Sequence, residues 1–287
     1  MDKILVAIGS SEQSFVLEHA CNLAKVFNAE IILLKVMEDE TNLAKFFSPR
    51  LSKEVYKAID DELQQLADET SVKTGLTINT VVAKGKVYEM IAEIAHSHNV
   101  ILIMMGTNTT FDVKKSFIGT NTLRVIRESK IPVITIKGKL LRRGCKNIVL
   151  PLDLNKETKG KVMKTIEFAK LFGSMVRVVS VLLTNDDFIV NRLMRQLGQV
   201  KKFIEKEGVE CTAEIIKGTK GKETVVECII DYANKMKGDL IVIMTQQEVE
   251  STEFFIGVTA QEIINQSEIP VMTLVPTMNK DVTVFQI

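Results

Sequence analysis

The sequence predicts an α/β fold in which two similar domains follow one another along the chain. Short apolar runs alternate with longer segments of helical periodicity over nearly all of the 287 residues, as in doubly wound sheets. The runs are apolar on both faces, which is typical of parallel strands covered by helices on each side. Two motifs also recur at one offset, because Phe117-Ile118-Gly119 matches Phe255-Ile256-Gly257 and Ile131-Pro132-Val133 matches Ile269-Pro270-Val271. A constant spacing of two separate motifs indicates a tandem duplication.

The first half begins with a strand over 3–8, which Gly9 closes. Ser11 and Ser14 accompany the start of an amphipathic helix, and their hydroxyls are suited to capping its amino end. The elements expected after it are a strand over 31–36, a loop or lid over 38–50, a charged helix over 51–74, an edge strand over 77–82, a helix opened by Gly85, a strand over 100–105, a helix whose first turn is Gly119-Thr120-Asn121, and a strand over 131–136. Strands that alternate with helices in this way predict right-handed βαβ units.

The second half repeats this order. Its expected strands cover 147–152, 176–183, 212–216, 240–244 and the segment after Ile269, and its expected helices cover 158–172, 192–207 and 225–236. These patterns divide the chain into a first domain over 1–138, a linker over 139–146, a second domain over 147–277 and a C-terminal tail over 278–287. The linker carries several basic side chains, which we interpret as solvated, with contact to an acidic partner or a phosphate as the alternative.

The composition argues against several classes of function. Hydrophobic residues make up 46% and charged residues 25% of the chain, a usual balance for soluble globular proteins. The net charge of +1 gives no electrostatic reason to expect a nucleic-acid partner. The four cysteines are scattered, so neither a disulfide framework nor a zinc site is expected. The sequence shows neither an apolar run of membrane-spanning length nor a signal-peptide pattern, so we expect a cytoplasmic protein without membrane attachment.

The segment between the fourth strand and the following helix is the strongest candidate for a binding site. It runs from Gly106 to Asn121 and ends in a predicted helix start. The first turn of a helix offers backbone N–H groups and the positive end of the helix dipole, and both attract anions. Gly106 and Gly119 would allow a ligand to approach the backbone closely. The alternative is an ordinary strand-to-helix loop with glycine at its ends.

The spacing within this segment resembles that of a known family. Gly106-x-x-Thr109, then nine residues, then Gly119-Thr120 resembles the universal stress protein signature, in which G-x-x-G is followed by nine residues and G-[ST]. The Ile-Pro-Val strands, and Gly85 and Gly218 before the third helix of each half, are also similar to that family. The resemblance covers nearly the whole chain as two copies. It implies that each half is a flavodoxin-like, adenine-nucleotide α-hydrolase-like domain with five parallel strands in the order 3-2-1-4-5 and helices on both faces.

The resemblance also implies a ligand and a place for it. Nucleotide-binding members hold ATP or a related adenine nucleotide, with which Mg²⁺ can be bound, between the ends of the first and fourth strands. The nucleotide-binding residues that it implies in the first half are Ala7, Gly9, Ser10, Val36, Met105, Gly106, Asn108, Thr109, Gly119, Thr120 and Asn121. The corresponding set in the second half, which we interpret as vestigial, is Leu152, Asp153, Val181 and Gly257. Neither catalytic residues nor metal-ligating side chains are expected.

Departures from the family pattern make the first half the better expected site. Gly9 stands where the family has an aspartate near the nucleoside, and Thr109 replaces the second glycine. The second half keeps the aspartate as Asp153, but its segment over 245–253 has no glycine and contains three glutamates, and Val258 follows Gly257 without a hydroxyl. Carboxylates beside a polyphosphate repel it, each by about 1 kcal/mol near a surface. We therefore expect the second half not to bind the nucleotide in the same way.

The function expected from these features is that of a nucleotide-responsive stress or regulatory binding module, not a dedicated enzyme. Two alternatives stay open: a slow ATPase, and a scaffold with vestigial sites that binds a protein or an apolar ligand. The Ile-Pro-Val strands predict that the halves pair through their fifth strands as a pseudo-dimer within one chain, with a homodimer as a further option. His96 and His98 lie two apart on a helix, do not share a face and are not expected to bind metal. The acidic runs Asp60-Asp61-Glu62 and Asp186-Asp187 are interpreted as solvated.

Overall fold

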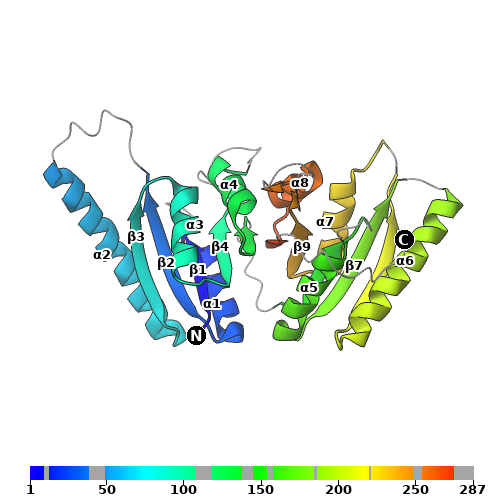
Figure 1. The fold of residues 1–287 in the computed structure, drawn as a ribbon, viewed down its shortest axis with the longest axis horizontal. Coiled ribbons are helices and arrows are strands. Elements are labelled where there is room, and N and C mark those ends of the chain that lie inside the picture. Colours follow the sequence, from blue (N-terminus) through cyan, green and yellow to red (C-terminus); the bar gives the residue numbers. More distant parts are fainter. Residues whose placement is uncertain are drawn as a thin grey trace. The chain divides into compact units, whose positions relative to one another are not determined.

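The computed structural model describes residues 1–9, 13–38, 49–107, 118–137, 145–153, 158–183, 186–219, 221–247 and 254–274 (Figure 1). Contacts between residues divide the chain into two compact units, Met1–Ile136 and Lys137–Ile287. Both units are α/β, as the sequence predicts. Most of the expected linker and the whole C-terminal tail lie outside the described residues, so the domain boundaries stay a prediction.

The first unit is a parallel sheet with helices between its strands. Its elements are β1 (Lys3–Ala7), α1 (Gln13–Phe27), β2 (Glu30–Met37), α2 (Pro49–Thr74), β3 (Ile78–Lys84), α3 (Val87–Ser97), β4 (Leu102–Gly106), α4 (Thr120–Glu128) and β5 (Val133–Ile136). The strands lie in the order β3-β2-β1-β4-β5, and each neighbouring pair is parallel. The predicted order 3-2-1-4-5 is therefore confirmed.

The second unit repeats this architecture. Its elements are β6 (Asn147–Pro151), α5 (Thr158–Phe172), β7 (Met175–Leu182), α6 (Asp187–Lys206), β8 (Cys211–Lys217), α7 (Val225–Lys235), β9 (Leu240–Met244), β10 (Gln246–Gln247), β11 (Phe254–Phe255), α8 (Val258–Gln266) and β12 (Val271–Leu274). The parallel strands have the order β8-β7-β6-β9-β12. The short antiparallel pair β10–β11 was not predicted from the sequence.

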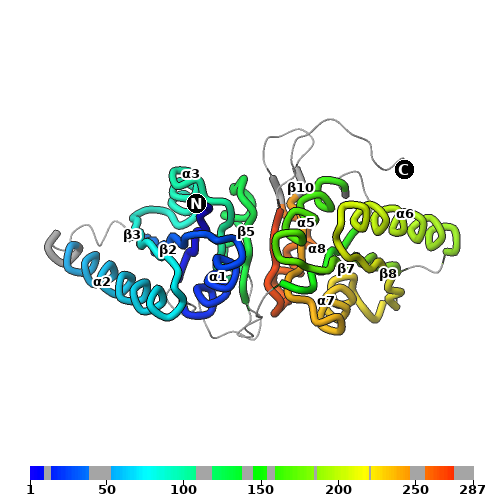
Figure 2. Tube along the Cα trace, turned by 90° about the horizontal axis from the view of Figure 1, so that it is seen from below, coloured from blue at the N-terminus to red at the C-terminus, as the bar shows by residue number. Residues whose placement is uncertain are grey.

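Burial on both faces explains why the strands are apolar along their whole length. Ile4, Leu5 and Val6 point to alternating sides of β1, yet all three are 0% exposed. Figure 2 shows α1 and α2 on one face of the first sheet and α3 on the other face. Helix α3 packs beside α4 in this unit. Alternating strands and helices thus bury a continuous core and leave the ends of the strands accessible.

Three helix starts differ from their sequence predictions. Helix α6 begins at Asp187 instead of Arg192, because Asp186 is its N-cap and accepts hydrogen bonds from the N–H groups of Phe188 (2.9 Å) and Ile189 (3.4 Å). The acidic pair is thus a helix start. Helix α2 begins at Pro49, a residue that suits a first helical position because it has no N–H to satisfy. Helix α3 begins at Val87 with Lys86 as N-cap, so Gly85 precedes it without being part of it.

Two further features concern membranes and metals. Across the described ranges, no helix combines the length and the apolar character that a bilayer crossing needs. The same ranges contain no group of three or more His, Cys, Asp or Glu side chains placed to hold a metal ion. His96 lies in the last turn of α3 and His98 is its C-cap.

Candidate functional site

A cavity of about 320 Å³ lies at the carboxyl ends of the first unit's strands. Strand β1 contributes Ala7 and the two residues after it, β2 contributes the stretch from Leu34 to Val36, and β4 contributes Met105 and Gly106. Helices α1, α3 and α4 complete the lining. The volume falls within the range of about 300–1,000 Å³ that is usual for small-molecule sites. The cavity sits between β1 and β4, where the order of the strands reverses, which is the usual ligand position in such sheets.

The cavity brings together residues that are far apart in the sequence. Six of the predicted site residues line it: Ala7, Gly9, Val36, Met105, Gly106 and Asn121. Gly119 and Thr120 are the N-cap and the first residue of α4, next to Asn121. Ser10, Asn108 and Thr109 lie outside the described residues. The lining residues that sequence reasoning missed are Ile8, Val16, Leu34, Lys35, Glu38, Val87, Ile91 and Thr122.

The amino end of α4 is held against the end of β4. The N–H of Gly119 donates to the carbonyl of Thr107 at 3.0 Å, and the Thr122 hydroxyl donates to the carbonyl of Gly106 at 3.3 Å. The N-cap Gly119 makes no side-chain capping bond, so the first-turn N–H groups, which lack intrahelical partners, are suited to an anion. A Cβ built on Gly119 would lie 3.5 Å from the Thr107 carbonyl, an ordinary contact. Packing within the protein therefore does not require glycine there.

Two charged side chains line this cavity. The Lys35 ammonium donates from Nζ to the Gly9 carbonyl at 2.9 Å. Burial lowers the pKa of Lys35, while the Glu62 carboxylate opposes that shift. The exposed Glu38 accepts a hydrogen bond at Oε1 from Asn121 Nδ2 at 3.0 Å, which links the end of β2 to the first turn of α4. The cavity thus has a cation at the end of β1 and a carboxylate beside α4.

Corresponding positions in the two units can be paired through their equivalent strands and helices. Helices α1 and α5 are each 15 residues long and each ends in phenylalanine, which pairs Val16 with Lys161. The N–H of Ile8 bonds to the second strand of its sheet at Leu34, and the N–H of Leu152 bonds in the same way to Val179. This equivalence pairs Gly9 with Asp153, Lys35 with Ser180 and Val36 with Val181.

The second unit presents different chemistry at the corresponding place. Lys161 donates from Nζ to the Pro151 carbonyl at 2.7 Å, so an ammonium group lies at the end of β6, where the first unit has the Val16 side chain. Ser180 donates to the Leu152 carbonyl at 2.5 Å. Gly257 is the N-cap of α8, and Val258 after it is 73% exposed. The three glutamates of the preceding segment lie outside the described residues.

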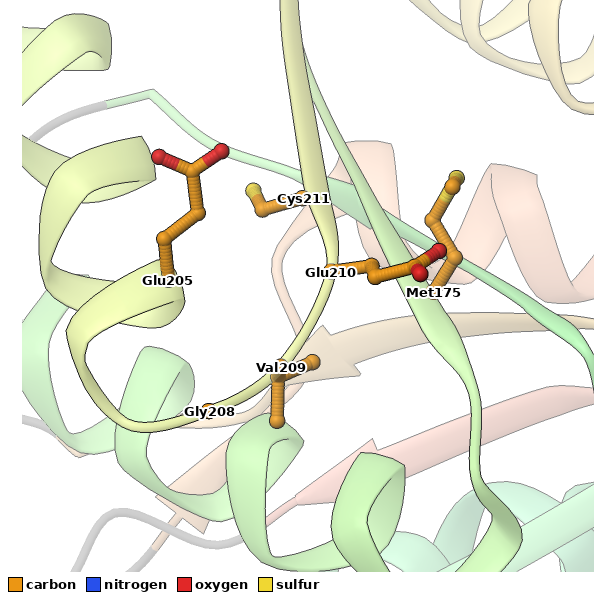
Figure 3. A pocket seen from close by; sticks show the side chains of 6 residues that line it. All are labelled: Met175, Glu205, Gly208, Val209, Glu210 and Cys211. Atoms are coloured by element: carbon orange, nitrogen blue, oxygen red, sulfur yellow. The ribbon is translucent and has the colours of Figure 1, made fainter.

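A second, open pocket of about 420 Å³ lies in the second unit, at the amino ends of strands β7 and β8. It is formed at the turn between α6 and β8, with Met175, Glu205, Gly208, Val209, Glu210 and Cys211 as its lining (Figure 3). Burial raises the pKa of the Cys211 thiol to about 12, and the Glu205 carboxylate adds to the shift. The thiol is therefore protonated near neutral pH and is a poor nucleophile. The amino ends of parallel strands are also not where ligands of such sheets lie.

Comparison with known proteins agrees with the duplicated architecture. The model of the universal stress protein family matches residues 1–137 and, separately, residues 144–275. The chain belongs to the universal stress protein family. Because each unit matches the family by itself, this universal stress protein is a tandem member.

Relatives of this universal stress protein are found among archaeal proteins. The universal stress protein MJ0531 of Methanocaldococcus jannaschii is 28% identical over 138 residues, covering 47% of this chain and 81% of that protein. MJ0577 of the same organism is 26% identical over 154 residues, covering 48% of this chain and 95% of that protein. A solved universal stress protein from Archaeoglobus fulgidus matches 97% of this chain and 98% of its own, with a TM-score of 0.72 and 19% identity. This last likeness supports the tandem fold.

Proposed function

We propose that this universal stress protein binds ATP or a related adenine nucleotide in the cavity of its first unit and acts as a stress-related or regulatory binding module. One observation carries the proposal. A cavity of about 320 Å³ lies where the strand order reverses and reaches the first turn of α4. Doubly wound sheets bind their ligands at this position. The choice of an adenine nucleotide as the ligand is based on the resemblance of the Gly106–Thr120 segment to the family signature.

The cavity lining contains groups that suit both parts of a nucleotide. Val16, Leu34 and Ile91 are apolar lining residues from three different elements, and burial of a base against apolar side chains is favourable. The amino end of α4 offers backbone N–H groups and the helix dipole to phosphates. Mg²⁺ would be held by the phosphates, whose oxygens are among its usual ligands in nucleotide sites.

The second unit supports the proposal less well. Lys161 reaches the Pro151 carbonyl from the helix position that Val16 occupies in the first unit. Its side chain therefore takes up space at the place where the first unit keeps an apolar wall. Val258 at the start of α8 and the glutamates before it add neither a hydroxyl nor a positive charge for phosphates. We therefore propose one nucleotide for each chain.

A pair of matched substitutions tests both the ligand and its location. Val36→Trp places an indole at the end of β2 in the cavity, and Val181→Trp makes the same change at the paired, equally half-buried position of β7. ATP is titrated calorimetrically into the intact protein and each variant. We expect one ATP per chain, an affinity weakened at least about tenfold by Val36→Trp, equivalent to about 1.4 kcal/mol, and an unchanged affinity in Val181→Trp.

The opposite pattern, in which Val181→Trp weakens binding and Val36→Trp does not, would place the nucleotide in the second unit. If the intact protein binds no ATP, the proposal is wrong and the alternative of a scaffold with vestigial sites is favoured. Release of phosphate from ATP and Mg²⁺ by the intact protein, lost in Val36→Trp, would instead support the slow ATPase.

A further inference from the structure

A positive charge lies at the end of β1 in the first unit's cavity. Lys35 Nζ lies 2.9 Å from the Gly9 carbonyl oxygen, and both residues line the cavity. An ammonium group has three N–H donors, and this bond uses one of them. Lys35 therefore has the capacity to hold a ligand acceptor and the Gly9 carbonyl at the same time.

The second unit has a carboxylate and a hydroxyl at the two paired positions, and the ammonium at this strand end comes instead from Lys161 on α5. Asp153 stands where the first unit has Gly9, and Ser180 stands where it has Lys35. The Ser180 hydroxyl donates to the Leu152 carbonyl, so it satisfies the strand end without bringing a charge. The carboxylate of Asp153 in the second unit thus corresponds to Gly9 in the first unit, and the hydroxyl of Ser180 corresponds to the ammonium of Lys35. A carboxylate accepts hydrogen bonds from ligand hydroxyls, whereas an ammonium donates and attracts an anion.

We infer that Lys35 determines specificity in the proposed nucleotide site by selecting ligands that carry a phosphate on the 2′- or 3′-oxygen of the ribose in addition to the 5′-phosphates. The inference rests on the proposed function. In a nucleotide whose 5′-phosphates lie at α4, the remaining part is the nucleoside, and the adenine base is uncharged near neutral pH. The sugar is the part of a nucleoside that can carry a further anion. A phosphate there is the group that we expect to pair with the Lys35 ammonium beside Gly9.

The distribution of charge over the lining favours this class of ligand. Among the described lining residues, Lys35 is the cation and Glu38 the anion, and Asn121 holds the Glu38 carboxylate beside α4. A sugar phosphate at the end of β1 would therefore meet the Lys35 ammonium, whereas Glu38 is bonded to Asn121. Partial burial of Lys35 strengthens such a pair, because nearby water screens it less. A plain ribose hydroxyl would gain only an ordinary hydrogen bond.

The test compares three ligands with the intact chain. Affinities for AMP, adenosine 2′,5′-bisphosphate and adenosine 3′,5′-bisphosphate are measured by titration calorimetry, and the readout is the ratio of each bisphosphate affinity to the AMP affinity. Two variants change the charge at the end of β1: Lys35→Met, which keeps an unbranched chain without the charge, and Gly9→Asp, which restores the carboxylate of the second unit. A Cβ built on Gly9 meets nothing within 4 Å, so the side chain has room. The matched controls are Gly9→Asn, which has the same size without charge, and Lys161→Met, which removes the ammonium of the second unit.

We expect at least one bisphosphate to bind about tenfold or more tightly than AMP, the usual worth of a charge-assisted hydrogen bond. The ratio should fall to about one in Lys35→Met and in Gly9→Asp, and stay high in Gly9→Asn and Lys161→Met. The bisphosphate with the higher ratio identifies the 2′- or the 3′-phosphate as the group selected. AMP binding without preference for either bisphosphate, or a preference that survives Lys35→Met, overturns this inference alone. Absence of binding by all three ligands and by ATP overturns the proposed function and the inference with it.

Discussion

Lys35 and Glu38 set the charge of the first unit's cavity, and neither was identified as a site residue from the sequence. Lys35 meets Gly9 across 26 positions and Glu38 meets Asn121 across 83 positions. The alternation of residues in a strand shows which face a side chain lies on. It does not show which loop or helix end the fold brings to that face. From the sequence alone, charged residues at strand ends are therefore expected to be solvated, unless they belong to a motif of known function.

Glu38→Gln is expected to raise the affinity for ATP in the absence of Mg²⁺. Glu38 accepts from Asn121 in the first turn of α4, so its carboxylate lies beside the place proposed for the phosphates. Glutamine keeps an acceptor for Asn121 and removes the negative charge. We expect a gain of about threefold by titration calorimetry, because interactions between exposed charges are worth up to about 1 kcal/mol.

The control for this change is Glu93→Gln, which removes an exposed carboxylate from α3 in the same unit, outside the cavity lining. Glu93→Gln should leave the affinity unchanged. A loss of affinity in Glu38→Gln would show that the carboxylate supports the site, and equal affinities in all three proteins would show that the phosphates lie elsewhere.

The predicted site residues that line the cavity were implied by the resemblance to the family. The resemblance places the ligand at the carboxyl ends of the strands, where Ala7, Val36 and Met105 lie, and all three line the cavity. Gly106 and Asn121 follow from the spacing that resembles the family signature, and they line it too. Thr122, which bonds to the Gly106 carbonyl, carries no signal in the sequence, because a hydroxyl in a helix can equally face solvent or its own backbone.

At the scale of elements, α3 in the first unit and α7 in the second unit are equivalent helices with different N-caps. Helices α3 and α7 are both 11 residues long. Thr224 and Glu227 form a capping box at the start of α7, whereas the N-cap of α3 is Lys86, which makes no side-chain capping bond. Glu89 occupies the third position of α3, as Glu227 does in α7. One substitution could therefore create in α3 the cap that α7 already has.

Lys86→Thr is expected to stabilise the protein and Thr224→Ala to destabilise it. Threonine in place of Lys86 can accept from the N–H of Glu89, while the ion pair lost between Lys86 and Glu89 joins side chains that are 68% and 46% exposed and is worth little. We expect the free energy of unfolding in urea to rise by about 0.5–1 kcal/mol for Lys86→Thr and to fall by about 1 kcal/mol for Thr224→Ala. A fall in both variants would mean that α3 does not form the box.

Most elements were predicted from periodicity, and the errors lie where local polar chemistry decides. Helix α5 and strand β9 have the predicted bounds, 158–172 and 240–244. The start of α6 was missed because its first turn contains the exposed apolar residues Phe188 and Ile189, which do not follow the amphipathic pattern. The N-cap Asp186 was the signal that could have found it. The pair β10–β11 has strands of two residues, too short for any period to show.

At the scale of the whole molecule, the constant offset of two motifs predicted the tandem architecture, which the family match to 1–137 and 144–275 confirms. Duplication explains why the two copies share their strand order, because the fold depends on the apolar pattern. Ligand binding depends on a few positions that can change independently, and the copies differ there, with Gly9 paired with Asp153 and Val16 paired with Lys161. Pairing of the halves through their fifth strands stays a prediction, as does the cytoplasmic location.

Three buried acidic groups of the second unit should make the protein sensitive to alkali. Burial raises the pKa of the Cys145 thiol, of the Cys211 thiol and of the Tyr232 hydroxyl each to about 12, and all three belong to the second unit. The nearby carboxylates Asp239, Glu205 and Glu214 add to the respective shifts. In the unfolded chain these groups titrate near their ordinary values of 9.0 for cysteine and 10.0 for tyrosine.

The unfolded chain therefore loses these protons first as the pH rises. The stabilisation is complete below about pH 9 and is lost between pH 9 and 12, with a slope of up to about 1.4 kcal/mol per pH unit for each group. Urea unfolding followed by circular dichroism should give a constant free energy of unfolding from pH 7 to 8 and a steep fall from pH 9 to 10.5. The double variant Cys145→Ala, Cys211→Ala should lose stability at all pH values through its smaller core side chains and yet show a shallower slope above pH 9. Equal slopes in the two proteins would mean that the folded thiols titrate like unfolded ones, and that the second unit's core admits water at those positions.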